Sequence, residues 1–409
     1  MKNTNFAFLS TLIPYGMEEK IAALSQNNMQ DAANALQWHL YNGLCKNLNT
    51  EIMLLNILPV GSYPQYYKEP FVKQSLFSTP YYPQNVNIGF CNIKLIRKFL
   101  QPCKVYNALD NWCHIHKGNK VLFVYTITAT FITAISKVKE KYPDLKVCAI
   151  VADLPDMVSL KANKGILQTM FEKRLSGLSY NNLDSIDAFV LLTRQMADYM
   201  RIRQPFCVVE GISTFPEESK VIQDTNQKII VYTGTLHKKF GIMNLIEAFR
   251  AIEGSEYRLI ICGIGDSEKE IEAASVLDRR IEYKGLLSRT EILKVQKTAT
   301  VLVNPRQNNE EFTKYSFPSK NLEYLSSGKP LIAYKLDGIP DDYDDYIYYV
   351  PDNSIKTLQQ TLVYVCTMNA AERSDKALKA QRFVWEEKNE IKQTKKIIDF
   401  LRKRGILND

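Results

Sequence analysis

The sequence lacks the features that mark membrane-spanning, secreted and zinc-binding proteins. No stretch approaches the roughly 20 apolar residues that a membrane-spanning helix needs. The N-terminal segment MKNTNFAFLSTLIPYG has no long apolar region of the kind found in signal peptides. The eight cysteines form no Cys-x-x-Cys pair, and several lie within apolar runs, which predicts buried, reduced thiols. We therefore expect a cytoplasmic protein.

Two further absences limit the partners and the architecture. The aromatic-glycine signature of an RNA-recognition sheet and the spacing of a zinc finger are both missing, so we expect no nucleic-acid partner. No internal repeat of solenoid length occurs. The net charge of +8 and the pI near 8.8 instead fit an anionic partner, such as nucleotide phosphates or an anionic membrane surface.

What is present points to two α/β domains. The chain has 409 residues, more than one ordinary hydrophobic core accommodates, and 45% of them are hydrophobic. Continuous apolar runs typical of buried strands alternate with helical patterns along residues 1–213 and again along residues 228–385. Each alternation predicts a doubly wound parallel sheet covered by helices on both faces.

The segments outside these alternations have other predicted roles. Residues 214–227 are polar and broken by Pro216, which is typical of a linker between domains. The segment AQRFVWEEKNEIKQTKKIIDFLRKR is amphipathic and basic, and we expect one continuous helix there. Its last part, within residues 386–409, is expected to pack back on the N-terminal domain.

Two glycine turns follow strands early in the second alternation. In VYTGTLHKKFGI, Gly234 lies between a strand and a helix, and Lys238 and Lys239 can supply positive charge to a diphosphate. In IICGIG, Gly263 and Gly265 repeat the pattern. The alternative for both is an ordinary strand–turn–helix connection with solvated lysines.

The segment YSFPSKNLEYLSSGKPLIA carries the strongest signal. Ser319 and Lys320 at a helix start present backbone donors, a hydroxyl and an ammonium group together, which suits a diphosphate. Glu323 lies almost one turn further on the same helix face and can accept both hydroxyls of a ribose. The alternative is a capped surface helix with an ordinary Lys–Glu ion pair.

This segment resembles the C-terminal signature of retaining GT-B glycosyltransferases of family four, the glycosyl transferases group one. The flanking segments YTGTLHKKFGI, ICGIGD and IEYKGLLSRTEI match the family's loops in the same order, and IDAFVLLTRQMADYM resembles the end of its acceptor domain. The resemblance implies an α/β fold of GT-B architecture, with two doubly wound Rossmann-like domains facing a central cleft. It also implies a nucleotide held by the C-terminal domain and no metal cofactor.

The resemblance assigns roles to particular positions. The residues implied for the nucleotide-sugar are Gly234, Thr235, Lys239, Gly263 and Arg306 for the diphosphate, Ser319 and Lys320 for phosphate and sugar, Glu323 for the ribose, and Gly285 and Leu286 for the base. Two positions depart from the family. Tyr315 stands where the Glu-x7-Glu motif has its first glutamate, and Thr235 where many members carry an arginine. We take Tyr315, Lys320 and Asp153 as the catalytic candidates.

The N-terminal half has fewer legible features. Asp153, in CAIVADLPDM, lies just beyond a strand end and can contact donor or acceptor hydroxyls. A helix N-cap before a proline turn is the alternative. Thr126 and Thr128 occupy the region where many relatives keep a histidine, and His39 beside Trp38 is expected to pack or to contact the acceptor.

Charged segments raise two more questions. The acidic loop DDYDDY, Asp341 to Tyr346, contains Asp-x-Asp, which binds a metal in the other large glycosyltransferase fold, but we expect a solvated loop. Basic-aromatic segments around Lys94 to Lys98 and Lys161 to Arg174 are typical of helices on anionic membranes. A solvated face with snorkelling lysines is the alternative.

The sequence thus predicts a retaining, metal-independent hexosyltransferase. The expected donor is a nucleotide diphosphate-sugar, with a UDP-sugar favoured. The expected acceptor is lipid-linked or a glycan, in bacterial surface-polysaccharide or glycan assembly, with peripheral contact to the inner face of the cell membrane. Two alternatives keep the fold: a non-catalytic partner subunit, favoured by Tyr315 in place of glutamate, and a nucleotide-sugar epimerase. Lys320 and Glu323 argue against the non-catalytic subunit.

Overall fold

The computed structural model describes residues 4–26, 31–154, 182–213 and 227–407. The chain divides into two compact units, one formed by residues 1–212 and 390–409 and the other by residues 213–389. The basic segment Lys161 to Arg174, and the expected linker apart from Gln227, lie outside the described residues. Within the described ranges, no helix is both long and apolar enough to span a bilayer.

The first unit is built on an eight-stranded sheet with the order β10-β9-β8-β7-β1-β2-β5-β4. All neighbouring strands run parallel except β4 and β5. The strands are β1 (Thr4–Ser10), β2 (Ile52–Asn56), β4 (Ser75–Phe77), β5 (Asn85–Asn87), β7 (Asn119–Tyr125), β8 (Lys146–Val151), β9 (Ala188–Leu191) and β10 (Phe206–Val208). The two-residue strands β3 (Phe71–Val72) and β6 (Phe90–Cys91) form a separate ribbon.

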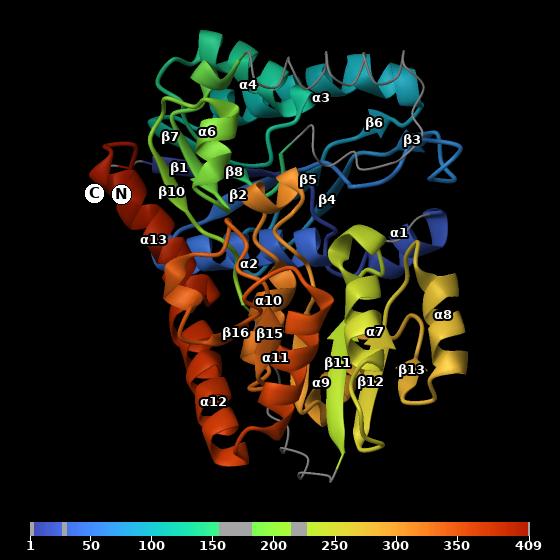
Figure 1. Cartoon of the computed structure of the whole chain (residues 1–409). Helices are drawn as coiled ribbons and strands as arrows, with labels where there is room; N and C mark the ends of the chain where they lie inside the picture. The colour runs from blue at the N-terminus through green and yellow to red at the C-terminus, as the bar shows by residue number, and fades with distance from the viewer. Residues whose placement is uncertain (1–3, 27–30, 155–181, 214–226, 408–409) are drawn as a thin grey trace. The chain divides into compact units, whose positions relative to one another are not determined.

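Helices cover both faces of this sheet, as the apolar strands predicted. They are α1 (Glu18–Leu24), α2 (Asp31–Leu48), α3 (Lys94–Ile115), α4 (Ala129–Lys141), α6 (Gln195–Met200) and α13 (Glu390–Lys403), with the 3-10 turn η1 (Leu183–Ser185). Helices α3 and α4 lie on one face, and α2 and α13 on the other (Figure 1). Because both faces are covered, most residues of β1, β7 and β8 are buried, and the remaining ones lie at the start of each strand.

Helix α13 packs closely on α2 because a glycine lies at the contact. A Cβ on Gly43 would lie 2.6 Å from both the carbonyl oxygen of Glu390 and Oγ1 of Thr394. His39 Nδ1 lies 3.1 Å from a carboxylate oxygen of Glu390, and Asn47 donates a 2.7 Å hydrogen bond to Thr394. Helix α13 is therefore held on α2 by polar contacts as well as by its buried apolar face.

The single final helix expected from the sequence is wrong, because the chain breaks after Glu387. The Asn389 side-chain amide donates hydrogen bonds of 2.6 and 3.0 Å to the carbonyl oxygens of Trp385 and Glu386. These bonds satisfy carbonyls that a continuing helix would have used, and so end α12 (Ala370–Glu387) before α13 begins.

The second unit contains a six-stranded, wholly parallel sheet with the order β13-β12-β11-β14-β15-β16. Its strands are β11 (Lys228–Thr233), β12 (Tyr257–Cys262), β13 (Ile281–Tyr283), β14 (Val301–Asn304), β15 (Leu331–Ala333) and β16 (Ile347–Tyr349). The helical elements are η2 (Lys238–Phe240), α7 (Ile242–Arg250), α8 (Glu268–Leu277), α9 (Arg289–Thr298), η3 (Glu311–Tyr315), α10 (Ser319–Ser326), η4 (Asp341–Tyr343), α11 (Ile355–Thr367) and α12. The two units, one with a mostly parallel sheet and one with a wholly parallel sheet, confirm the predicted α/β class.

The strand order of the second sheet reverses between β11 and β14. In a doubly wound sheet, loops leaving the carboxyl ends of strands diverge at such a point, and ligands bind in the space between them. We therefore expect a ligand site between the loops that follow Thr233 and Asn304.

All eight cysteines are free thiols. Cys45, Cys113, Cys148, Cys262 and Cys366 are buried, as expected. The prediction is wrong for Cys103, which is exposed on α3, and holds only in part for Cys91 and Cys207, which are half-buried.

Candidate functional site

The candidate site begins where the loop after β11 meets the loop after β14. Gly241 closes the first loop with a φ of +80°, and a Cβ there would lie 2.0 Å from the carbonyl oxygen of Pro305. Only glycine permits both that backbone conformation and that approach. The two loops at the reversal point of the sheet are thus in direct backbone contact.

The second glycine turn packs against the first. Gly263 has a φ of +137°, and a Cβ on it would lie 1.8 Å from the carbonyl oxygen of Gly234. The Gly234 N–H donates to the carbonyl of Cys262 at 2.9 Å, and the Gly263 N–H donates to the carbonyl of Gly285 at 2.8 Å. Both amides are therefore engaged within the protein. These glycines shape the loops, and their own amides are not available to an anion.

Two cations lie over two phenyl rings beside these turns, and we refer to Lys239, Phe240, Arg306 and Phe312 as the Lys239–Arg306 cluster. The Arg306 guanidinium lies 4.2 Å from the ring centroid of Phe240 and 5.4 Å from that of Phe312. The Lys239 ammonium lies 5.3 and 5.7 Å from the same centroids. Among the described residues, no carboxylate forms an ion pair with either cation.

The surroundings of Lys239 and Arg306 disfavour the charged forms of both side chains. Burial and the neighbouring positive charge of Arg306 lower the pKa of Lys239. Burial also lowers the pKa of the Arg306 guanidinium. Asp266 and Glu310 act on Lys239 only from beyond ion-pair distance. Two like charges on apolar rings, with no described carboxylate in an ion pair with them, are therefore stabilised by an anionic ligand. Lys238 differs, because it is exposed and pairs with Glu270 at 2.5 Å.

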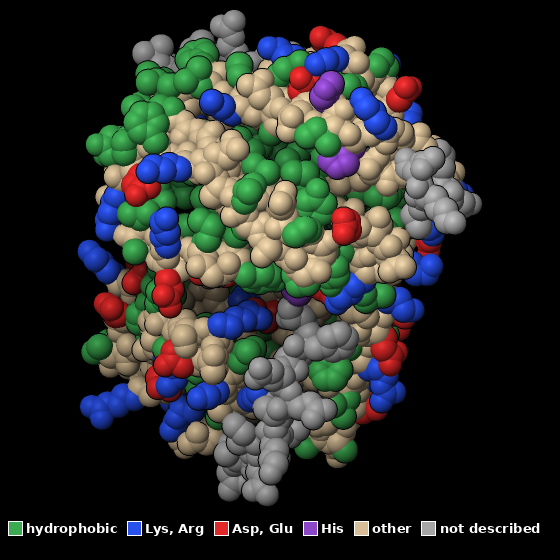
Figure 2. All heavy atoms as spheres, turned by 180° about the vertical axis from the view of Figure 1, so that it is seen from behind, with side chains coloured by type: hydrophobic (Ala, Val, Ile, Leu, Met, Phe, Trp, Pro, Cys, Tyr) green, Lys and Arg blue, Asp and Glu red, His purple; other side chains and the backbone are tan. Residues whose placement is uncertain are grey.

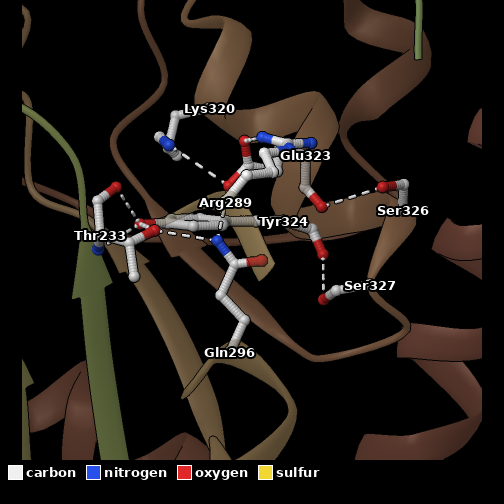
Figure 3. A network of polar contacts seen from close by, with 8 residues as sticks. All are labelled: Thr233, Arg289, Gln296, Lys320, Glu323, Tyr324, Ser326 and Ser327. Carbon is white, nitrogen blue, oxygen red and sulfur yellow. Dashed lines mark hydrogen bonds and ion pairs between the residues drawn. The ribbon is translucent and has the colours of Figure 1, made fainter. Parts of the chain in front are cut away.

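The second part of the site surrounds one carboxylate, and we call Glu323, Lys320, Arg289 and Gln296 the Glu323 network (Figure 3). Oε1 of Glu323 accepts hydrogen bonds from Gln296 Nε2 at 2.5 Å and from Lys320 Nζ at 3.2 Å. Oε2 accepts one from Arg289 at 2.8 Å. Residues of α9 and α10 therefore converge on a single side chain.

The network is tied to the end of β11. Gln296 is fully buried and donates a second hydrogen bond, of 2.9 Å, to Thr233 Oγ1. The Tyr324 hydroxyl accepts from the Thr233 N–H at 2.8 Å and donates to the Thr233 carbonyl at 2.9 Å. These bonds fix α9 and α10 relative to the strand from which the first glycine turn leaves.

Glu323 is ionised at neutral pH. Its burial would raise the pKa, but the charges of Lys320 and Arg289 and the hydrogen bond from Gln296 outweigh burial, and the pKa lies below the usual glutamate range. A buried carboxylate of this kind accepts hydrogen bonds and is not available as a proton donor.

Several residues expected from the sequence come together here. Lys320 lies against the first glycine turn, since a Cβ on Gly234 would lie 3.6 Å from Lys320 Cε. Ser319 begins α10 and is exposed. Leu286 is a 68% exposed apolar side chain next to Gly285, at the end of β13.

Other expected residues have a looser relation to the site. Thr235 is exposed, and its carbonyl accepts a 2.8 Å hydrogen bond from the buried Tyr232 hydroxyl, whose pKa burial raises to about 12. Tyr315 is half-buried at the end of η3. Asp153 follows β8 with an exposed side chain and belongs to the first unit, whereas the other site residues belong to the second.

Lysine side chains form ion pairs with the carboxylates of the acidic loop around η4. Asp342 pairs with the buried Lys388 at 2.8 Å, and Lys335 pairs with Asp341 at 3.0 Å and with Asp344. Across the described ranges, no group of three His, Cys, Asp or Glu side chains is placed to hold a metal ion.

Sequence reasoning missed Arg289, Gln296, Tyr324 and Thr233. A signal was present for two of them, since Arg289 and Gln296 are seven residues apart on α9 and so share one helix face. The sequence does not show what this helix face contacts, because its partner on α10 is distant in the sequence.

A doubly wound domain with clustered cations at its reversal point has the arrangement in which such domains bind nucleotides. The family can be stated more closely, because residues 214–383 match the family model for glycosyl transferases group 1. The match confirms the resemblance of the second unit to glycosyl transferases group 1. No curated protein matches the chain in sequence.

Solved structures similar to this chain extend the likeness to both units. Sucrose-phosphate synthase from Thermosynechococcus elongatus aligns over 98% of this chain and 99% of its own, with 13% identity and a TM-score of 0.65. The lipopolysaccharide outer core galactosyltransferase WaaB in its apo form aligns over 98% and 99%, with 15% identity and a TM-score of 0.59. HepE from Anabaena, in complex with UDP, aligns over 98% and 100%, with 11% identity and a TM-score of 0.58. These likenesses show the GT-B fold.

Proposed function

We propose that this glycosyltransferase moves a hexose from a nucleotide diphosphate-sugar, with a UDP-sugar favoured, to a lipid-linked or glycan acceptor. The observation that carries the proposal is the pair of cations Lys239 and Arg306, without a described carboxylate partner, beside a buried, ionised Glu323 at the strand-order reversal. A nucleotide diphosphate-sugar carries a dianionic diphosphate, which suits the two cations, and neutral hydroxyls, which suit the Glu323 carboxylate.

In this proposal the diphosphate lies between Lys239, Arg306 and Lys320, and the ribose contacts Glu323. The exposed Leu286 packs against the base. The UDP preference is supported by the Anabaena relative, which was solved with UDP. An acceptor attached to a lipid is supported by the similarity to a lipopolysaccharide galactosyltransferase.

The proposed reaction retains the anomeric configuration. The bond between the anomeric carbon and the diphosphate oxygen breaks, and an acceptor hydroxyl oxygen bonds to that carbon from the same face. The proton of the hydroxyl passes to the departing diphosphate. Lys239, Arg306 and Lys320 stabilise the negative charge that develops on the leaving group, the role that a divalent metal fills in other enzymes. Tyr315 contacts the sugar in place of a glutamate, and Asp153 contacts donor or acceptor hydroxyls.

The first turns of α3 are the proposed site of membrane contact. Leu95, Ile96, Phe99 and Leu100 are exposed, Phe99 by 72%. Hydrophobic side chains gather over this end of α3, at the upper left of Figure 2. The exposed Lys94 stands beside them, and each lysine near an anionic bilayer contributes about 1 kcal/mol.

One expected membrane contact is excluded by the structure. The Arg97 guanidinium points inward, where it donates to the Val60 carbonyl at 2.7 Å and to the Asn92 side chain at 3.1 Å. Burial lowers the pKa of Arg97 to about 10. The apolar residues of the α3 surface therefore carry more of the proposed affinity than the sequence suggested.

Vesicle sedimentation tests this contact. We expect the chain to pellet with vesicles that contain phosphatidylglycerol, less so at high salt, and Phe99→Glu to reduce the bound fraction several-fold. Val276→Glu is the matched control, because Val276 is an 80% exposed apolar residue on α8. Equal loss in both variants, or no dependence on anionic lipid, would contradict membrane contact through α3.

The donor proposal is tested by binding and turnover with a panel of UDP-, GDP- and ADP-sugars in EDTA. We expect at least one to stabilise the chain against heating, because a ligand of the native state raises its stability, and to be consumed when acceptor is added. If none binds, a non-catalytic subunit with this fold becomes the better account. If binding needs Mg²⁺ or Mn²⁺, the metal-independent part of the proposal fails.

A further inference from the structure

We infer that Arg289 competes with the ribose of the donor for Oε2 of Glu323, and so sets how strongly the site selects a ribonucleotide over a deoxyribonucleotide. The inference rests on the proposed function.

The acceptor positions of Glu323 are nearly used up. Each carboxylate oxygen accepts about two hydrogen bonds. Oε1 already accepts from Gln296 and Lys320, and Oε2 accepts from Arg289. One position therefore remains, on Oε2, whereas a ribose presents two neighbouring hydroxyl donors. For both hydroxyls to bind Glu323, one of the three protein donors must leave.

Arg289 is the donor that leaves most easily. Its side chain is 61% exposed, whereas that of Lys320 is 30% exposed and Gln296 is fully buried. An exposed ion pair contributes roughly 0–1 kcal/mol to stability, because water solvates the two charges when they separate. Removing Gln296 would instead leave a buried amide without this partner, which costs more. The guanidinium can turn into solvent while Gln296 and Lys320 keep their places.

The competition has a signature that a general electrostatic effect lacks. Removing Arg289 also removes one positive charge near the proposed diphosphate, which weakens the binding of every nucleotide alike. The freed acceptor position on Oε2 strengthens the binding only of nucleotides that carry both ribose hydroxyls. A 2′-deoxynucleotide lacks one of them. The ratio of the dissociation constants of deoxyribo- and ribonucleotide therefore isolates the competition from the charge.

The test measures dissociation constants of UDP and 2′-deoxy-UDP by isothermal titration calorimetry for the wild type, Arg289→Ala and Lys294→Ala. Lys294 is the matched control, because it is an exposed cation on the same helix. We expect the deoxy-to-ribo ratio to rise about three- to fivefold in Arg289→Ala, the size of one exposed ion pair. Lys294→Ala should keep the wild-type ratio, and Arg289→Lys should lie between the two.

An unchanged ratio in Arg289→Ala would overturn the competition. A fall in the ratio would overturn it too, and would mean that Arg289 itself binds the hydroxyl. If UDP does not bind the wild type, GDP and ADP with their 2′-deoxy forms replace it. If none of these binds, the proposed function fails, and the inference fails with it.

Discussion

The Lys239–Arg306 cluster and the Glu323 network lie on loops and helices at the carboxyl edge of the same sheet, yet their charges are arranged in opposite ways. In the first, two cations lie over phenyl rings, and no described carboxylate pairs with them. In the second, three donors surround one buried carboxylate. The first arrangement is stabilised by an added anion, and the second offers a neutral hydroxyl an acceptor. Pairing, more than the number of charges, distinguishes the two parts of the site.

The largest expected effect comes from the contact between the two glycine turns. Gly263→Ala should lower the free energy of unfolding by about 3 kcal/mol, because the new Cβ would overlap the Gly234 carbonyl at 1.8 Å and strain the backbone. Gly285→Ala is the control, since its φ is +64° but no atom lies within 4 Å of the added Cβ. It should cost about 1 kcal/mol. Urea unfolding measures both, and equal values would mean that the turn contact is not tight.

The next effect separates paired from unpaired cations. Lys239→Ala and Arg306→Ala should each weaken nucleoside diphosphate binding roughly ten- to a hundredfold, because each removes a charge-assisted contact of about 1.5–3 kcal/mol. Lys238→Ala should change it less than about twofold, since Lys238 is already paired with Glu270 at the surface. Titration calorimetry gives all three values. Equal losses at Lys238 and Lys239 would show that only the net charge matters.

The salt dependence of nucleotide affinity should also differ between the two regions. Glu323→Ala should weaken ribonucleotide binding about tenfold and also destabilise the fold, because it leaves Gln296, which is buried, without one of its acceptors. The salt dependence of the remaining affinity should stay close to that of the wild type. In Arg306→Ala it should become weaker. Dissociation constants measured across an ionic-strength series decide this, and matching slopes in the two variants would contradict the division of roles.

Much of the second unit was predictable because its signals are local. The glycine turns and the Pro-Ser-Lys…Glu run each occupy a few consecutive residues, so their placement at strand and helix ends followed from the sequence. Pairing was not predictable. Phe312 and Arg306 meet Lys239 and Phe240 only because β11 and β14 are neighbours in the sheet.

The first unit was harder to read for a different reason. Helix α3 was anticipated only near its start, as a candidate membrane-surface segment. Its first turns expose Leu95, Ile96 and Phe99, while the buried stripe of Val105, Leu109 and Trp112 begins only later. That change of the apolar face along one helix breaks the periodicity by which buried helices are recognised. No comparable local motif marks Asp153.

The smallest predicted effect concerns protons. The pKa of Lys239 is lowered before an anion binds, and a bound diphosphate should raise it, so the complex takes up protons where the pH is near that pKa. Affinity should be full below the lowered pKa and fall as the pH rises through it. Lys239→Arg should lose this part of the dependence, because arginine stays protonated. Calorimetry in buffers of different ionisation enthalpy measures the uptake, and the ionisation of the ligand itself cancels between the two proteins. Identical uptake in both would exclude Lys239 from the anion contact.

In the proposed function, the Lys239–Arg306 cluster binds the diphosphate of a nucleotide-sugar. The most direct measurement is a titration of the full chain, in EDTA, with UDP and with uridine, repeated for the Lys239→Ala Arg306→Ala double variant. We expect UDP to bind the wild type at least about tenfold more tightly than uridine, and the double variant to lose most of this difference. Equal affinities of the wild type for UDP and uridine, or a difference that survives in the double variant, would exclude the cluster as the diphosphate site.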